Sequence, residues 1–158
     1  MMFNPYSLFS SLENNHPIIQ YSLIIPIFNE EESLLSLMKE ITQTIQGLEN
    51  PYEIIFVNDG SSDRSLAVIQ EFKKKSPDQI RIINLAKRQG QTFALRKGLE
   101  TAKGNIAITL DADLQNDPAD IIKLLDKMKE GYDVVCGWRK KREDKPLKVY
   151  LSTLGNRL

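Results

Sequence analysis

The regular alternation of short apolar runs with amphipathic stretches constrains the fold of this chain more than any other feature. Five runs rich in Ile, Val and aromatic residues are typical of buried strands: residues 21–28, 53–57, 80–85, 105–110 and 132–136. Strands that alternate with helices pair in parallel through right-handed crossovers. The chain is therefore predicted to form an α/β fold with a mostly parallel, open, doubly wound sheet flanked by helices.

The stretches between these runs carry apolar residues at three- and four-residue spacing, which predicts helices. The first helix presents Leu34, Leu35, Met38, Ile41 and Ile45. Later helices are predicted at residues 65–75, 91–102 and 119–129. Asn29, with Glu32 three residues on, predicts a capping box at the first helix. Asp117 before Pro118 predicts a cap ahead of a first-turn proline at the last.

The 158 residues, of which 41% are hydrophobic and 27% charged, suffice for one domain with a substantial core. We expect a loosely ordered leader over residues 1–17, the main domain over 18–137, and a basic loop with the start of an amphipathic helix over 138–158. The 21 basic residues balance the 21 acidic ones, so no overall field favours nucleic acid as a partner. The last segment is basic, however, which suits anionic lipid or a phosphorylated acceptor as well as a solvated loop.

The single cysteine, Cys136, excludes an internal disulfide and is compatible with a reducing compartment. Its neighbours Val134, Val135 and Gly137 predict a small core residue at this position. No stretch approaches the roughly 18 apolar residues of a membrane span, and the start lacks the pattern of a signal peptide. We therefore expect a soluble or peripheral protein.

Polar residues follow the predicted strands at the points where the strands end. An open parallel sheet binds ligands outside the carboxyl ends of its strands, near the point where the strand order reverses. Asp111 and Asp113 follow strand 105–110, and paired carboxylates suit Mg²⁺ or Mn²⁺, which commonly bridge to substrate phosphates. The pair therefore indicates a nucleoside diphosphate as the ligand, although a solvated turn can carry the same two residues.

Four blocks after the strands carry a family resemblance: residues 24–30 (Ile-Ile-Pro-Ile-Phe-Asn-Glu), 57–61 (Val-Asn-Asp-Gly-Ser), 110–118 and 137–139 (Gly-Trp-Arg). In this order and at these positions they resemble family 2 glycosyltransferases, close to the polyprenyl-phosphate sugar transferases that include dolichyl-phosphate mannose synthase. The resemblance covers about residues 20–145 and implies the glycosyltransferase-A fold, which is Rossmann-like. One departure is Gln89, where relatives often have Asn, and it affects a loop contact.

The resemblance assigns the nucleoside pocket to residues that follow the first two strands. Pro26, Phe28 and Glu30 would line it, with the ring as a stacking face and the carboxylate as a hydrogen-bond acceptor. Asn58 and Asp59 would contact the base and ribose. Residues 29–32 are also an ordinary helix start, and residues 58–61 an ordinary turn.

The resemblance places the donor diphosphate at the paired aspartates. Asp113 and Gln115 would bind the metal, and Asp111 would contact ribose or metal; Gln115 could instead cap the loop. Arg139 would hold a donor or acceptor phosphate, because a guanidinium binds phosphate bidentately. Lys87 and Arg88 could add positive charge, but a solvated surface position is favoured for both.

The implied reaction is inverting transfer of a hexose from a UDP- or GDP-linked sugar to a polyprenyl or dolichyl phosphate. Mg²⁺ or Mn²⁺ would act as a Lewis acid on the leaving diphosphate. A phosphate acceptor is already ionised near neutral pH, so it needs no general base, and no histidine lies near the four blocks. The lipid acceptor implies a membrane surface or membrane partner and a peripheral position at the cytoplasmic membrane face. A homo-oligomer is compatible with it.

Family members usually continue beyond the length of this chain, so we expect its C-terminal part to be truncated and nucleotide binding to survive better than transfer. A second hypothesis is therefore a binding module that keeps donor recognition without turnover. A third is a nucleotidyltransferase on a similar sheet. That class would show a glycine-rich basic loop after the first strand, and residues 26–31 contain neither glycine nor a basic residue.

Overall fold

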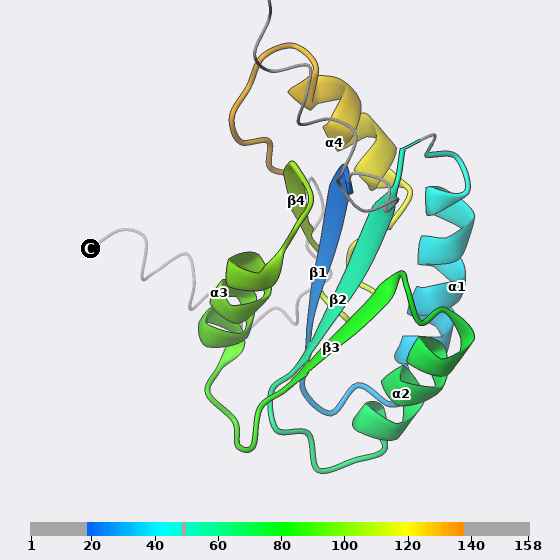
Figure 1. The fold of residues 1–158 in the computed structure, drawn as a ribbon, viewed down its shortest axis with the longest axis vertical. Helices are drawn as coiled ribbons and strands as arrows, with labels where there is room; N and C mark the ends of the chain where they lie inside the picture. Colours follow the sequence, from blue (N-terminus) through cyan, green and yellow to red (C-terminus); the bar gives the residue numbers. More distant parts are fainter. Residues whose placement is uncertain (1–18, 49, 138–158) are drawn as a thin grey trace, which may run out of the picture. The chain divides into compact units, whose positions relative to one another are not determined.

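The computed structural model describes residues 19–48 and 50–137, which form a parallel sheet with helices on both faces (Figure 1). The strands are β1 Tyr21–Ile27, β2 Tyr52–Asn58, β3 Ile80–Asn84 and β4 Ile106–Thr109. The helices are α1 Leu34–Ile45, α2 Ser65–Lys75, α3 Gln91–Thr101 and α4 Asp120–Met128. Because each of these elements lies within about one residue of its predicted range, the α/β fold read from the alternation is confirmed.

The strand order is β3-β2-β1-β4, and every pairing is parallel. The chain moves outward from β1 to β3 and then returns to the other side of β1, so the strand order reverses between β1 and β4. Ile27 pairs with Asn58, which pairs with Asn84. The carboxyl ends of three strands therefore lie at one edge of the sheet, where an open α/β sheet places its ligand.

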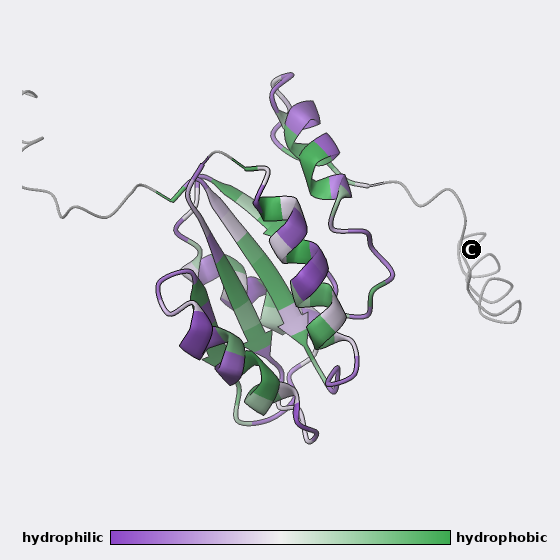
Figure 2. Cartoon of the chain, turned by 90° about the vertical axis from the view of Figure 1, so that its right-hand side faces the viewer, coloured by the Kyte–Doolittle hydropathy of each residue, from purple (hydrophilic) through white to green (hydrophobic). Residues whose placement is uncertain are grey.

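β1 is the centre of the core, and all seven of its residues are buried. Helix α3 contacts β1 and β2, while α1 and α2 lie together on the opposite face (Figure 1). A buried cluster of Ile24, Ile55, Val57 and Ala94 lies between the sheet and α3. A side chain at Gly98 would overlap Ile24, so α3 approaches β1 closely because this position is glycine. The hydropathy colours show green strands between helices that carry purple outward (Figure 2).

The strand predicted at residues 132–136 is not present, since the described residues 131–137 contain neither helix nor strand. The predicted core position of Cys136 is also wrong, because this residue is exposed, and Val134 is 76% exposed. An apolar run becomes a strand only when its backbone groups pair with a neighbouring strand. Within the four-stranded sheet, β4 is an edge and pairs with β1 alone.

The chain divides into two compact units, one ending at Ile121 and the other beginning at Ile122. The start of α4 carries the predicted cap, because Asp117 Oδ1 accepts the N–H of Ala119 at 2.9 Å. Lys127 pairs with Glu130 at 2.7 Å in the second unit. Within the described ranges, no helix combines the length and the apolar character needed to cross a membrane.

The capping box predicted at Asn29 and Glu32 is wrong. Helix α1 begins at Leu34, and Ser33, the residue before it, makes no side-chain capping bond. Asn29 instead adopts a left-handed backbone with φ 57°. Its side-chain oxygen accepts the N–H of Ser62 in the loop after β2, at 2.8 Å. A residue that signals a helix start can equally serve a turn, and here a contact between two loops has taken it.

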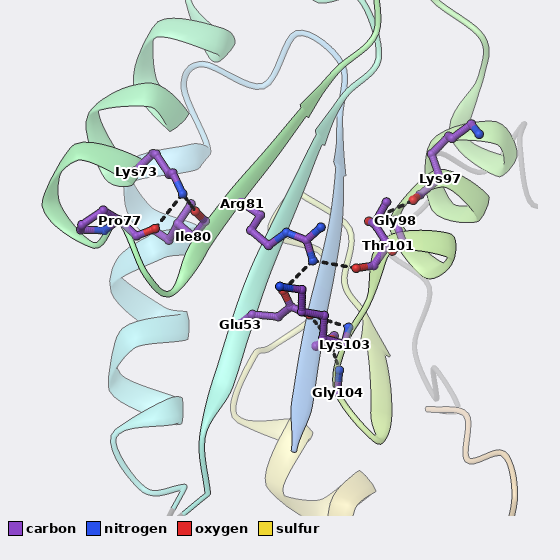
Figure 3. A network of polar contacts seen from close by, with 11 residues as sticks. Glu53, Lys73, Pro77, Ile80, Arg81, Lys97, Gly98, Thr101, Lys103 and Gly104 are labelled. Carbon is purple, nitrogen blue, oxygen red and sulfur yellow. Dashed lines mark hydrogen bonds and ion pairs between the residues drawn. The ribbon is translucent and has the colours of Figure 1, made fainter. Parts of the chain in front are cut away.

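A buried carboxylate joins the amino ends of the strands (Figure 3). Glu53, on β2, accepts hydrogen bonds from Ser22 Oγ at 2.7 Å and from the Lys103 N–H at 2.7 Å, and it pairs with Arg81 at 2.9 Å. Arg81 also donates to the carbonyl of Thr101 at 2.6 Å. Burial raises the pKa of Glu53, but the bonds from Arg81, Lys103 and Ser22 outweigh it and leave the pKa below its ordinary value.

Candidate functional site

The loops after β1 and β2 are held together by hydrogen bonds at the carboxyl edge of the sheet. The N–H of Glu30 donates to Ser65 Oγ at 2.8 Å, and that of Glu31 donates to Asp63 Oδ2 at 3.1 Å. In return, the N–H of Arg64 donates to Glu31 Oε2 at 2.7 Å. Burial raises the pKa of Asp63, but hydrogen bonds from Ser65 and Glu31 outweigh it and hold the pKa below its ordinary value. This network fixes the backbone on which Phe28 and Glu30 stand.

Asp59 holds the loop between β3 and α3. Its Oδ1 accepts the N–H of Gln89 at 2.6 Å, and its Oδ2 accepts the N–H of Gly90 at 2.8 Å. Gly60 follows with φ 69°, and a Cβ at this position would lie 2.5 Å from the backbone nitrogen of Arg88. A non-glycine residue would therefore be strained here and would also push the loop away. The two residues after β2 thus set the path of the loop that carries Arg88.

Arg88 lies over the ring of Phe28, with its guanidinium carbon 3.9 Å from the ring centroid. A cation within about 6 Å of an aromatic face is attracted by the ring quadrupole. The two residues come from the loops after β3 and β1, so the contact crosses the carboxyl edge of the sheet. The surface position favoured for Arg88 from the sequence is therefore only half correct, because the residue is exposed but rests on a predicted site residue.

The two aspartates after β4 are held in different ways. Asp111 Oδ1 accepts the side-chain amide of Gln91 at 2.7 Å, and its Oδ2 lies 3.5 Å from the amide of Asn116. Asp113 Oδ1 accepts the N–H of Gln115 at 3.0 Å. Leu114, which stands between Asp113 and Gln115, has a left-handed backbone with φ 59°. Such a conformation is rare for a bulky residue and is concentrated at functional sites.

These loops surround a cavity of about 270 Å³. We call it the donor-edge cavity, and its lining residues are Pro26, Ile27, Phe28, Glu30, Asp59, Arg88, Gln91, Asp111, Ala112 and Asp113. Its volume lies just below the usual range for small-molecule sites, so a large ligand would extend beyond it. Four of the lining residues are carboxylates, and Arg88 is the one cation among the described lining residues. The cavity therefore combines an apolar ring with strongly acidic walls.

The carboxylates of Asp111 and Asp113 suit a divalent metal that binds together with a phosphate ligand. No cluster of three or more His, Cys, Asp or Glu residues suited to a metal occurs among the described residues. Mg²⁺ is usually held by one or two carboxylates together with substrate phosphates and waters, rather than by a protein cage. Asp111 and Asp113 meet that requirement, because both line the donor-edge cavity.

Most of the predicted site residues meet in this cavity. Pro26, Phe28, Glu30, Asp59, Asp111 and Asp113 all line it. Asn58 and Gln115 are not among the lining residues: Asn58 is 2% exposed and donates to Asn84 Oδ1 at 2.7 Å, and its own Oδ1 lacks a partner among the described residues. The predicted role of Arg139 lies outside the described residues.

Sequence reasoning missed Gln91 as a site residue. It is the first residue of α3, lines the donor-edge cavity and binds Asp111. The only available signal was its position after the loop that follows β3, since a helix start at the carboxyl edge of such a sheet faces the ligand. Its type carried no information, because glutamine is common in solvated loops.

The sequence profile described as "Glycosyl transferase family 2" matches residues 22–156. Among solved structures, a mannosyltransferase from Pyrobaculum calidifontis in complex with GDP-Man and Mn²⁺ is 24% identical, with a TM-score of 0.51 over 65% of this chain. TarS 1–349 from S. aureus in complex with UDP is 18% identical, with a TM-score of 0.53 over 78%.

Glucosyl-3-phosphoglycerate synthase from Mycobacterium tuberculosis, in complex with uridine diphosphate, is 25% identical, with a TM-score of 0.55 over 72% of this chain. These matches cover 30%, 40% and 41% of the respective neighbours' chains. The chain thus spans less than half the length of each.

Proposed function

Because this chain belongs to glycosyl transferase family 2, we propose that its donor-edge cavity binds a nucleotide-diphosphate sugar and that the protein transfers the sugar. The observation that carries this proposal is that Phe28 and Glu30 line the same cavity as Asp111 and Asp113. An aromatic ring with an acceptor suits a nucleoside, and paired carboxylates suit a metal-bridged diphosphate. GDP-Man with Mn²⁺, and UDP, are bound in similar structures and support this choice of ligand.

Asp111 and Asp113 would hold Mg²⁺ or Mn²⁺, and Gln115, next to them, would complete the set. When bound, the ion supplies Lewis acidity to the leaving diphosphate. The chain's own residues prepare the site. Gln91 and Asn116 orient Asp111 through uncharged amides, so neither of these two partners cancels its negative charge.

Pro26, Phe28 and Glu30 would position the nucleoside, with Asn58 and Asp59 beneath the base and ribose. Each carboxylate oxygen of Asp59 accepts one hydrogen bond from the loop, from the N–H groups of Gln89 and Gly90. A carboxylate offers about four acceptor positions in total, so it can bind a ligand N–H or hydroxyl while it still holds the loop. Fixed groups of this kind reduce the entropy that must be lost when the donor is aligned.

We propose a polyprenyl or dolichyl phosphate as the acceptor and a peripheral position at the cytoplasmic membrane face. The acceptor oxygen of a phosphate is ionised near neutral pH, so attack with inversion at the sugar carbon does not require a residue that removes a proton. The basic segment 138–158, with Arg139, supports a phosphate or anionic lipid partner. A membrane partner or a second copy of the chain could complete the acceptor side.

A binding module without turnover is the second candidate, because an aromatic ring and paired carboxylates in one cavity account for nucleotide binding by themselves. One experiment separates the two. Calorimetry with UDP and GDP in Mn²⁺ measures donor recognition, and radiolabelled UDP- or GDP-hexose with polyprenyl phosphate vesicles measures transfer. Binding with product formation supports the enzyme, while binding alone supports the module. Absence of binding to either nucleotide contradicts both.

A further inference from the structure

We propose that Arg88 is a donor-responsive residue that covers Phe28 in the free protein and moves to the diphosphate when the donor binds. The nucleobase would then take the ring face that the guanidinium has left. This inference rests on the proposed function, because it requires a nucleoside diphosphate in the donor-edge cavity. It adds a positioning role that neither the aspartates nor the nucleoside-binding residues fulfil.

The backbone around Arg88 is held from two sides, whereas its side chain lies at the surface. Asp59 holds the next two backbone N–H groups at 2.6 and 2.8 Å. Gly60 lets the loop approach so closely that a Cβ would lie 2.6 Å from the carbonyl carbon of Lys87. Arg88 itself is exposed. An exposed side chain whose backbone is anchored can change rotamer without moving the loop.

Among the described residues, the interaction partner of the Arg88 guanidinium is the ring of Phe28, in a cation–π contact. Over residues 19–48 and 50–137, Arg88 takes part in no ion pair or hydrogen bond, although four carboxylates line the same cavity. A cation–π contact at an exposed site changes an equilibrium by about two- to fivefold. The guanidinium is therefore held weakly enough for a ligand to displace it.

The charge balance of the donor-edge cavity indicates where Arg88 would go. Glu30, Asp59, Asp111 and Asp113 would together repel a diphosphate, and Arg88 is the described lining residue that opposes this charge. A guanidinium binds phosphate oxygens bidentately and more strongly than it binds an aromatic face. A diphosphate with its metal therefore offers Arg88 a better partner than the ring.

The base and the guanidinium cannot use the same face of Phe28 at once. Removal of Arg88 should therefore have opposite effects on two ligands that share a base. A nucleoside gains, because the ring is already free. A nucleoside diphosphate loses, because the charge-assisted bonds to its phosphates are gone. A residue that served only to hold the loop would weaken both ligands together.

The test compares the full 158-residue chain with Arg88→Ala in Mn²⁺, with uridine, guanosine, UDP and GDP as probes. Calorimetry is used for the diphosphates and ligand-observed NMR for the weaker nucleosides. We expect the nucleoside that matches the preferred diphosphate to bind two- to fivefold more tightly to the variant. We expect that diphosphate to bind roughly ten- to a hundredfold more weakly.

Arg88→Lys keeps the charge but not the planar fork, so it should recover part of the diphosphate affinity while the nucleoside still gains. Lys87→Ala is the matched control, because it removes the same charge from the adjacent position, which does not line the cavity; it should change neither affinity more than about twofold.

Equal weakening of both ligands in Arg88→Ala, no change in either, or nucleoside binding undetectable in both forms would overturn the inference. If the unaltered chain binds neither UDP nor GDP, the proposed function itself fails, which is a separate result.

Discussion

The side-chain amide of Gln91 donates a hydrogen bond of 2.7 Å to Asp111 Oδ1. The bond connects the first residue of α3 with the second residue after β4, so it ties the start of the helix that precedes β4 to the loop that follows this strand. A neutral donor fixes the orientation of a carboxylate and leaves its charge available to a metal. Lysine at position 91 would fix it as well but would cancel that charge.

Gln91→Ala should weaken Mn²⁺-dependent binding of the preferred nucleotide by about fivefold, because Asp111 loses its orienting donor, a bond of about 1 kcal/mol. Calorimetric titration with UDP and GDP in Mn²⁺ measures this. Gln89→Ala is the control, since the backbone N–H of Gln89, and not its side chain, contacts Asp59. Equal affinities for Gln91→Ala and the unaltered chain would exclude a positioning role.

Replacement of both Asp111 and Asp113 by Asn should abolish the dependence of nucleotide affinity on the metal. The unaltered chain is expected to lose at least about tenfold in affinity when EDTA replaces Mn²⁺, since the metal bridges protein and diphosphate. The double variant should show one weak affinity under both conditions. Asp78→Asn, in the loop between α2 and β3, removes one carboxylate outside the cavity and should keep the metal effect. A metal effect that persists in the double variant would place the ion elsewhere.

Gly60→Ala should destabilise the fold by about 2 kcal/mol and also weaken nucleotide binding. The added Cβ meets the Arg88 backbone nitrogen at 2.5 Å at a position where φ is 69°. Both strain and displacement of the loop follow from that contact. Urea unfolding gives the stability, and titration with UDP and GDP gives the affinity. Gly47→Ala, where a Cβ would have an ordinary contact at 3.4 Å, should leave both nearly unchanged.

Glu53→Gln should lower the free energy of unfolding at neutral pH by about 3 kcal/mol, because it breaks a buried ion pair with Arg81. The folded-state pKa of Glu53 is lowered, so its stabilisation is present above the ordinary carboxyl pKa and is lost as the pH falls through the folded value. The variant should therefore lose less stability than the unaltered chain on acidification. Urea unfolding between about pH 3 and 7 covers this window.

The control for Glu53 is Glu71→Gln, which removes an exposed pair with Lys74 and should have little effect. Parallel stability curves for Glu53→Gln and the unaltered chain across the acidic range would contradict the assignment of the pH-dependent term to Glu53.

The strands and helices could be predicted because their signals are local. Each apolar run has the length of a strand, and each amphipathic stretch shows its own period. Residues 132–136 show the limit of this reasoning, since a run of the right composition becomes a strand only when its backbone groups pair with a neighbouring strand, and β4 pairs with β1 alone. Asn29 shows another limit: the same side chain can cap a helix or bind a loop, and the choice depends on Ser62, 33 positions away.

The site could be predicted at the level of its edge and its acidic pair, because the rule for open sheets fixes where strands end. The contacts between loops could not. Arg88 reaches Phe28 because Asp59 holds the intervening loop and Gly60 allows its approach. Each of those residues has an ordinary reading as part of a turn, and only the packed loops distinguish the two.

The buried Glu53 with its partners Ser22, Arg81 and Lys103 and the donor-edge cavity lie at opposite ends of the same strands. Substitutions around Ser22, Glu53 and Arg81 can be screened for thermal robustness with little risk to ligand recognition. Exchange of the loops at the carboxyl ends of the strands would change ligand preference while the sheet stays the same. Stability and ligand preference can therefore be engineered almost independently in this architecture.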